Sequence, residues 1–134
     1  MPLRQVECLK PGAPRCAPLG VDVINGAVLA PDERALYVLG RDQVRILRRE
    51  LATGVLRDDG CVSLRPRARC ARVHGGASFA SVEQLAFLPD GRFAYLGYDT
   101  YREHPGVQVL CGDSGDDTLT PVRGRGSWER EPRA

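Results

Sequence analysis

The sequence predicts an all-β chain that contains two similar four-stranded antiparallel sheets. Glycine and proline account for 15 and 10 of the 134 residues, so the chain turns often and long helices are disfavoured. Hydrophobic residues make up 43% of the chain, which is enough for a packed core. A unit of about 55–60 residues occurs twice, and each copy contains four short segments with the composition of strands.

The repeat is clearest in two nine-residue segments, 30–38 and 88–96. Proline, aspartate, arginine and tyrosine occupy the same places in both segments, 58 residues apart. A cysteine pair precedes each segment, and further along the chain residues 44–47 match residues 107–110 at an offset of 63. The second copy is therefore longer, by about 4 residues before its first strand and about 5 after its second.

In the first copy, residues 26–30 form a small apolar run that ends at a Pro-Asp turn signal. Residues 35–40 are rich in β-branched and aromatic side chains, and residues 43–49 alternate in character. A Thr-Gly turn follows, and residues 55–62 return as a fourth strand. The corresponding strands of the second copy are expected at residues 83–88, 92–98, 106–111 and 118–123.

Repeated four-stranded antiparallel units are typical of β-propeller blades. The alternative, a seven-stranded immunoglobulin-like sandwich, predicts no such repeat. Segments 30–38 and 88–96 also resemble the S-P-D-G-R-x-L-Y-V signature of lactonase-like and YVTN-type β-propellers. Residues 48–56 are similar to the R-D-x-x-T-G-x-L hairpin of the same family.

Residues 60–63, followed by Cys70, resemble a cysteine-containing subgroup of exported bacterial propeller repeats. The resemblance covers about residues 3–123, and the chain departs from the signature at Ala30, Glu33 and Leu88. Members of this family range from sugar-lactone hydrolases to proteins without known activity. None of the catalytic motifs of the hydrolases can be matched in this chain, so no catalytic residue is carried over.

The repeat and the resemblance together divide the chain into four parts. We expect residues 1–7 to be the last strand of a preceding blade, residues 8–60 blade 1, residues 61–123 blade 2, and residues 124–134 a disordered tail. Closed propellers have typically 4–8 blades. Two blades therefore imply a fragment of a larger propeller or a protomer for one, with further blades as partners, from the same longer chain or a homo-oligomer.

The five cysteines indicate two local disulfides. Cys8 lies close to Cys16 in the sequence, and Cys61 close to Cys70, which leaves Cys111 free. Zinc is poorly supported because no C-x₂-C spacing occurs. Disulfides imply an oxidising compartment, but the N-terminus has no apolar signal-peptide core. We therefore expect a piece of a secreted, cell-surface or periplasmic protein.

Charge and composition argue against several function classes. With 19 basic and 17 acidic residues, the net charge of +2 does not favour nucleic-acid binding. No apolar stretch approaches the roughly 18 residues of a membrane span. Asp113, Asp116 and Asp117 lack the spacing of a calcium loop, and we interpret residues 112–115, Gly-Asp-Ser-Gly, as a turn and not as a protease nucleophile loop. No metal or cofactor is expected.

Polar residues gather in the loops at one edge of the expected blades. The loop between the second and third strands of a blade opens on the same edge as the loop before its first strand. Both length differences between the copies fall on this edge, and such insertions often mark a binding face. The candidate ligand-binding residues there, suited to a sugar, a lactone or a peptide, are Arg41, His74, Asp99, Tyr101 and His104.

A second polar cluster is the arginine-rich loop between Cys61 and Cys70. Arg65, Arg67 and Arg69 would suit a sulfate or phosphate, but an exposed loop with mutually repelling charges, including Arg72 just beyond it, is the favoured interpretation.

These observations predict a non-enzymatic β-propeller module of an exported bacterial protein, with a structural or ligand-binding role. The alternative is part of a lactonase-like hydrolase whose catalytic groups lie on missing blades or partner chains. Hydrolysis needs a metal or acid/base groups at the central channel. Glu83 is the only acid on the strands expected to line that channel, 26–30 and 83–88, which favours the non-enzymatic module.

Overall fold

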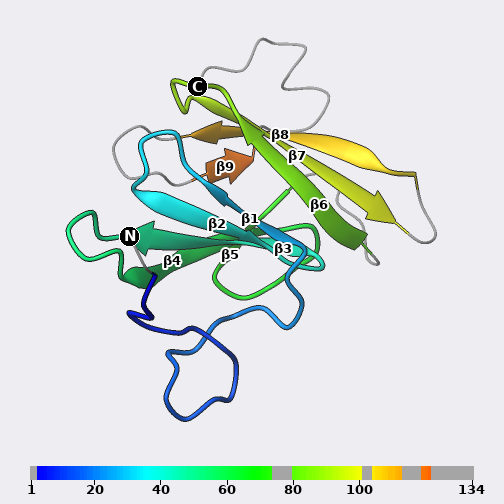
Figure 1. The fold of residues 1–134 in the computed structure, drawn as a ribbon. Helices are drawn as coiled ribbons and strands as arrows, with labels where there is room; N and C mark the ends of the chain where they lie inside the picture. Colours follow the sequence, from blue (N-terminus) through cyan, green and yellow to red (C-terminus); the bar gives the residue numbers. More distant parts are fainter. Residues whose placement is uncertain (1–2, 74–79, 101–103, 113–118, 122–134) are drawn as a thin grey trace.

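The computed structural model describes residues 3–73, 80–100, 104–112 and 119–121. This part of the chain is all-β and forms two stacked sheets (Figure 1). It contains no helix that could cross a membrane. The all-β prediction is confirmed, and so is the pattern of consecutive antiparallel strands in each copy of the repeat.

Sheet 1 contains five strands in the order β1-β2-β3-β4-β5. They are β1 (Gly26–Leu29), β2 (Ala35–Leu39), β3 (Gln43–Arg49), β4 (Leu56–Ser63) and β5 (Cys70–Arg72). Sheet 2 contains four strands in the order β6-β7-β8-β9. They are β6 (Ala80–Phe87), β7 (Phe93–Thr100), β8 (Gly106–Gly112) and β9 (Leu119–Pro121).

Three details differ from the sequence-based expectation. Sheet 1 has a fifth strand, β5, which pairs parallel to β4 with Cys70 opposite Cys61, the cysteine to which it is bonded. Strand β6 begins at Ala80, earlier than expected, because its first residues pair with the end of β7. Residues 3–7, the described part of the segment expected to be the last strand of a preceding blade, form no strand.

The Pro-Asp motif of the repeat is a structural turn in both copies. The Asp32 carboxylate accepts a hydrogen bond from the backbone N–H of Arg34, and Asp90 accepts one from Arg92, both at 3.0 Å. The residue after each aspartate has a left-handed backbone, with φ of 66° at Glu33 and 74° at Gly91. Glycine adopts this conformation without strain, which explains its presence in the family signature.

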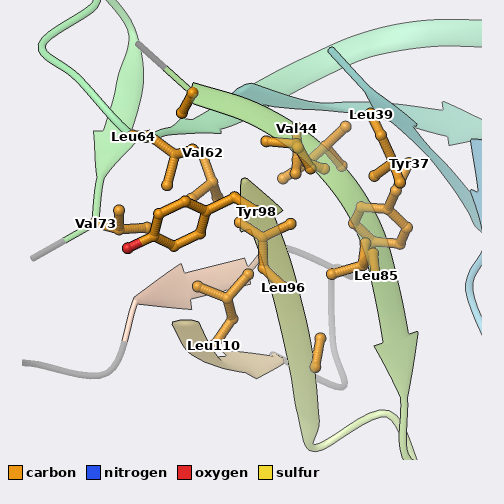
Figure 2. Close-up of a cluster of buried hydrophobic side chains, with 14 of the residues drawn as sticks. Tyr37, Leu39, Val44, Val62, Leu64, Val73, Leu85, Leu96, Tyr98 and Leu110 are labelled. Atoms are coloured by element: carbon orange, nitrogen blue, oxygen red, sulfur yellow. The ribbon is translucent and has the colours of Figure 1, made fainter. Parts of the chain in front are cut away.

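The main hydrophobic core lies between the two sheets (Figure 2). We call the face of each sheet that borders this core its near face. Sheet 1 contributes residues such as Tyr37, Val44 and Val62, and sheet 2 contributes residues such as Leu96 and Leu110. The Tyr37 and Phe87 rings pack across this interface with centroids 4.9 Å apart. Because one core joins both sheets, the two copies stabilise each other.

A second, smaller core lies on the opposite face of sheet 1, which we call its far face. Leu19 and Val21, from the chain before β1, are buried there together with Val38 and Leu47 of the sheet. Figure 1 shows the N-terminal segment on the side of sheet 1 that faces away from sheet 2. Sheet 1 is therefore covered on both faces.

Candidate functional site

The loop edge predicted from the sequence lies at one end of sheet 2. The antiparallel register pairs Ala80, at the start of β6, with Thr100, at the end of β7. The loops that enter β6 and leave β7 therefore share this end, as expected. His74 and Tyr101 lie outside the described residues, so their proposed roles stay predictions.

A polar depression of about 100 Å³ opens at this end of sheet 2. It is lined by Ser81, Glu83, Asp99 and Thr100. Asp99 is exposed, and its carboxylate also accepts a hydrogen bond of 2.9 Å from the backbone N–H of Thr100. Ser81 and Thr100 were not predicted as site residues. The sequence does not show that β6 begins at Ala80, which places Ser81 opposite Asp99 and Ala80 opposite Thr100.

Two further predicted residues approach the same end. The backbone carbonyl of Arg41 accepts a hydrogen bond of 2.9 Å from the N–H of Val82, next to Ser81. His104 is exposed two residues before β8, whose first residue, Gly106, pairs with Tyr98. The structure thus brings Arg41, Asp99 and His104 to one edge, but it shows no shared contact among their side chains within the described part of the chain.

Asn25 is a residue at this edge that sequence analysis missed. Its side-chain amide nitrogen lies 2.8 Å from Ser81 Oγ, 2.8 Å from the carbonyl of Val82 and 3.2 Å from the carbonyl of Gly40. These atoms belong to both sheets, so Asn25 links the two blades beside the depression. An asparagine in a loop carries no sequence signal for such a long-range contact.

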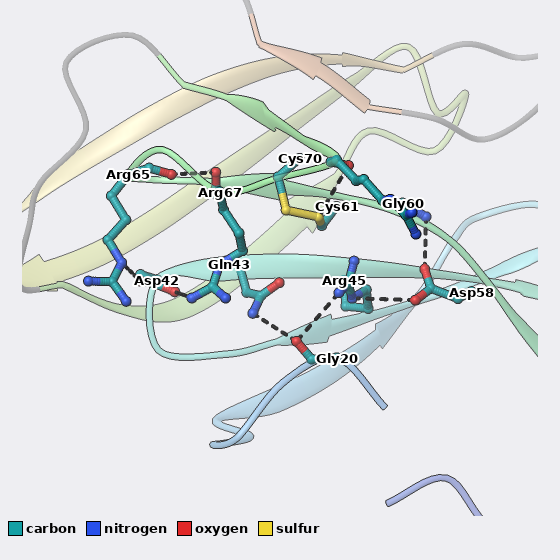
Figure 3. The surroundings of a disulfide bond; sticks show 12 residues. Gly20, Asp42, Gln43, Arg45, Asp58, Gly60, Cys61, Arg65, Arg67 and Cys70 are labelled. Atoms are coloured by element: carbon teal, nitrogen blue, oxygen red, sulfur yellow. Dashed lines mark hydrogen bonds and ion pairs between the residues drawn. A yellow bond between two sulfur atoms is a disulfide. The ribbon is translucent and has the colours of Figure 1, made fainter. Parts of the chain in front are cut away.

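The arginine-rich loop has a structural role that differs from both sequence interpretations. Arg65 and Arg67 pair with the carboxylate of Asp42, which is buried, with Arg67 at 3.0 Å (Figure 3). The positive charges of these two arginines are thus paired with a carboxylate of the protein. They neither form an unoccupied anion site nor stand as unpaired, mutually repelling charges. Asp42 also accepts, through its backbone carbonyl, a hydrogen bond of 2.8 Å from Leu64.

The predicted disulfides are present. Cys8 is bonded to Cys16, and Cys61 to Cys70, with Cα–Cα distances of 4.8 and 4.6 Å. Disulfides are typical of oxidising compartments. Cys111 is free, and partial burial raises the pKa of its thiol above the ordinary value through desolvation.

The face of sheet 2 that points away from sheet 1 has an apolar centre, and no described segment covers it. We call it the open face; β7 and β8 supply most of it. Tyr95 is 39% exposed, Val109 is 36% exposed and Val107 is 67% exposed. Strand alternation places Phe93 and Cys111 on the same face.

The sequence repeat gives each of these residues a counterpart in sheet 1. Tyr95 corresponds to Tyr37, Val107 to Val44 and Val109 to Ile46. The three counterparts are only 1%, 0% and 3% exposed, because they lie on the near face against sheet 2. The open face therefore repeats a surface that this protein buries elsewhere under another sheet.

The described part of the chain contains no candidate metal site. No group of three or more His, Cys, Asp or Glu side chains within it has an arrangement that could hold a metal ion. Several segments discussed from the sequence lie outside the described residues. They are Asp113, Asp116 and Asp117, the Gly-Asp-Ser-Gly segment at 112–115 beyond its first residue, and the expected tail at 124–134.

Comparison with known proteins shows the fold. No family model matches the chain, and no curated protein matches it significantly. The chain is similar to a crystal structure of a protein from Lactobacillus plantarum, a lactonase-like β-propeller, with a TM-score of 0.57 and 20% sequence identity. The match covers 73% of this chain but 26% of that one, so the chain spans about a quarter of the length of this neighbour. The likeness supports a propeller-like fold.

Proposed function

We propose that the chain is a non-enzymatic β-propeller module whose role is to bind a further β-sheet of the same kind through its open face. The observation that carries this proposal is the difference in exposure between equivalent residues. Tyr37, Val44 and Ile46 are buried under a following sheet, whereas Tyr95, Val107 and Val109 present the same surface to solvent. Exposed contiguous apolar surface of this kind marks interaction sites.

The chemistry of the open face suits a sheet better than a small ligand. Tyr95 and Val109 are direct cross-strand partners, and Val107 lies opposite Gly97 on the same pair of strands. Side chains on such a face form a flat layer, which packs best against the side chains of a second sheet about 10 Å away. The near face of sheet 1 packs in this way, with equivalent residues at equivalent places.

Self-association tests this docking, because the open faces of two copies can pack on each other, sheet against sheet. We expect sedimentation velocity on the parent chain to show reversible association between about 1 and 500 μM. Val107→Lys should weaken it about 10–100-fold, because it places a charge in an interface that would otherwise bury apolar surface. The matched control is Val6→Lys, since Val6 is 64% exposed and belongs to the N-terminal segment, which lies on the side of sheet 1 away from sheet 2.

The thiol of Cys111 provides a second readout, because it lies on the open face. Its alkylation should slow as the chain associates, and Val107→Lys should remove that protection. The proposal fails if the parent chain stays monomeric over the whole range, or if Val107→Lys and Val6→Lys associate like the parent. The two disulfides support an exported protein as the setting for this role.

A second candidate function is ligand binding at the loop edge, favoured by the depression beside Asp99. Ser81, Thr100 and the two carboxylates of Glu83 and Asp99 offer hydrogen-bond partners for the hydroxyl groups of a sugar or lactone, or for a peptide. NMR titration with gluconolactone tests it. Shifts at Ser81 and Thr100 that disappear in Asp99→Ala would support the site, and unchanged spectra of the parent would reject it for this ligand class.

The lactonase-like hydrolase stays the alternative to a non-enzymatic module. Glu83 and Asp99 share the depression, so an acid/base pair is available there. Lactone hydrolysis assayed with and without added divalent metal discriminates the two classes. Turnover that is lost in Glu83→Gln would favour the enzyme.

A further inference from the structure

The far face of sheet 1 repeats the surface that sheet 2 uses for packing. Val38 corresponds to Leu96, and Leu47 to Leu110, at the offsets of the sequence repeat. Leu96 and Leu110 lie on the near face of sheet 2, buried against sheet 1. Val38 and Leu47 are buried too, but they are covered by the N-terminal segment and not by a sheet.

One chain therefore carries both halves of a sheet–sheet interface. The open face of sheet 2 is equivalent to the near face of sheet 1, and the far face of sheet 1 is equivalent to the near face of sheet 2. Placing the open face of one copy on the far face of another would reproduce the packing seen between sheets 1 and 2. Such a contact is head-to-tail and can continue from copy to copy.

The N-terminal segment, residues 3–24, occupies the far face, and we call it the cap. Leu19 and Val21 are its buried side chains, with Leu9 partly buried beside them. The Glu7 carboxylate accepts a hydrogen bond of 2.6 Å from the backbone N–H of Leu56. The carbonyl of Gly20 accepts hydrogen bonds from Gln43 Nε2 at 3.0 Å and Arg45 Nη2 at 3.5 Å. Within the described residues the cap adds no strand to sheet 1, so no ladder of backbone hydrogen bonds holds it.

The cap is closed on itself. The Cys8–Cys16 disulfide and a bridge between Leu9 and Ala17 hold its loop together. The N–H of Lys10 donates to the carbonyl of Ala17 at 3.0 Å, and the N–H of Ala17 donates to Cys8 at 2.9 Å. These contacts do not involve sheet 1, so the loop keeps them when it separates from the sheet.

The cap also leaves polar atoms at its interface without hydrogen bonds. Figure 3 shows Gln43 and Arg45 beside Gly20. Gln43 Oε1 and Arg45 Nε are buried there and have no hydrogen-bond partner among the described residues. The Asp58 carboxylate, 3.7 Å from Arg45 Nε, supplies only a long ion pair. Buried polar atoms without partners destabilise an interface, so they weaken the hold of the cap on sheet 1.

We propose that the cap is a displaceable cover over a second docking surface, and that the open face of a second copy takes its place. This inference rests on the proposed function, because it uses the open face as the incoming surface. With the cap in place a chain offers one docking surface. Without it, the chain offers two complementary ones and assembles head-to-tail.

The test is a chain with a protease recognition sequence inserted after Asp22, folded first and then cut. The cap, with its disulfide intact, is then held by non-covalent contacts alone. We expect it to dissociate on dilution below micromolar concentration. After the cap is removed by gel filtration, sedimentation velocity on the concentrated remainder should show assemblies larger than those of the uncut chain. Adding oxidised cap peptide should reverse the growth, and Val107→Lys should prevent it without changing cap affinity.

Leu19→Asp provides the same test without an insertion, because a buried carboxylate weakens the cap in the intact chain. The matched control is Leu3→Asp, which changes a fully exposed leucine of the cap. Leu19→Asp should enlarge the assemblies and Leu3→Asp should not.

Three results would overturn the inference: a cut cap that stays bound at nanomolar concentration, a remainder that loses its β-sheet circular dichroism when the cap leaves, or a folded remainder that grows no larger than the uncut chain. Failure of the proposed function looks different, because the uncut parent would then show no association that depends on Val107.

Discussion

Val44 and Val107 occupy the same place in the two copies of the repeat, and replacing each with alanine measures what a covering sheet contributes. Val44 is fully buried between the sheets, whereas Val107 is 67% exposed on the open face. Removing two carbons from Val44 loses about 1.6 kcal/mol of burial at ~0.8 kcal/mol per carbon. The cavity that is left raises the cost to about 2–3 kcal/mol. For Val107, a third of that burial predicts a loss of about 0.5 kcal/mol.

Urea unfolding followed by far-UV circular dichroism gives both values, at a protein concentration low enough to keep the chain monomeric. A slope of about 1–3 kcal/mol per molar urea converts the predicted 2 kcal/mol difference between the two variants into a midpoint difference of roughly 1 M. Equal losses in the two variants would refute the reasoning, because they would mean that the two valines have the same surroundings. A large loss for Val107 alone would show that the open face is covered within the chain itself.

Three further outcomes follow from the contacts of sheet 1 and sheet 2. Asp42→Ala should lower the free energy of unfolding by about 1–3 kcal/mol, because Arg65 and Arg67 lose their buried carboxylate partner; Glu50→Ala, at an exposed acid, is the control, and equal thermal midpoints would contradict the role assigned to Asp42. Replacing both Cys61 and Cys70 with serine should cost about 2–3 kcal/mol, as expected for a short disulfide loop, and no change in the urea midpoint would count against it. Cys111 should react with iodoacetamide more slowly in the native chain than in urea at pH 8, and its rate should rise at a higher pH, because the raised pKa keeps the thiol protonated. The contribution of this thiol to the free energy of unfolding is fully present below its pKa in the unfolded chain, and it is lost as the pH rises through its pKa in the folded chain. Alkylation rates with the same pH dependence in the native and the urea-unfolded chain would contradict the effect of burial.

Local sequence signals were sufficient for most of the strands and for both disulfides. The Pro-Asp turns and the alternation of residues 43–49 act over a few residues, so they are visible without the fold. The cysteine pairs are close in sequence, and short loops leave few alternative pairings. The short strand β5 was missed because three residues carry no pattern of their own, and its pairing depends on the bond between Cys70 and Cys61.

The contacts that define the candidate sites were beyond local sequence signals. Asp42 meets Arg67 from 25 residues away, and Asn25 meets Ser81 from 56 residues away. Each contact depends on how whole strands are stacked, so neither residue type nor spacing predicts it. Arg41, Asp99 and His104 lie near one edge, a position that follows from the antiparallel order of the strands alone, and their role in ligand binding stays a prediction.

The sequence by itself determined the repeat and the antiparallel order of four consecutive strands in each copy. It could not determine which of two equivalent faces would be buried, because Tyr37 and Tyr95 stand in the same motif. Stacking decides that question: sheet 2 covers Tyr37, the cap covers the far face of sheet 1, and no described segment covers Tyr95. Burial is a property of the neighbour as much as of the residue, so only the tertiary structure separates the buried interface from the free one.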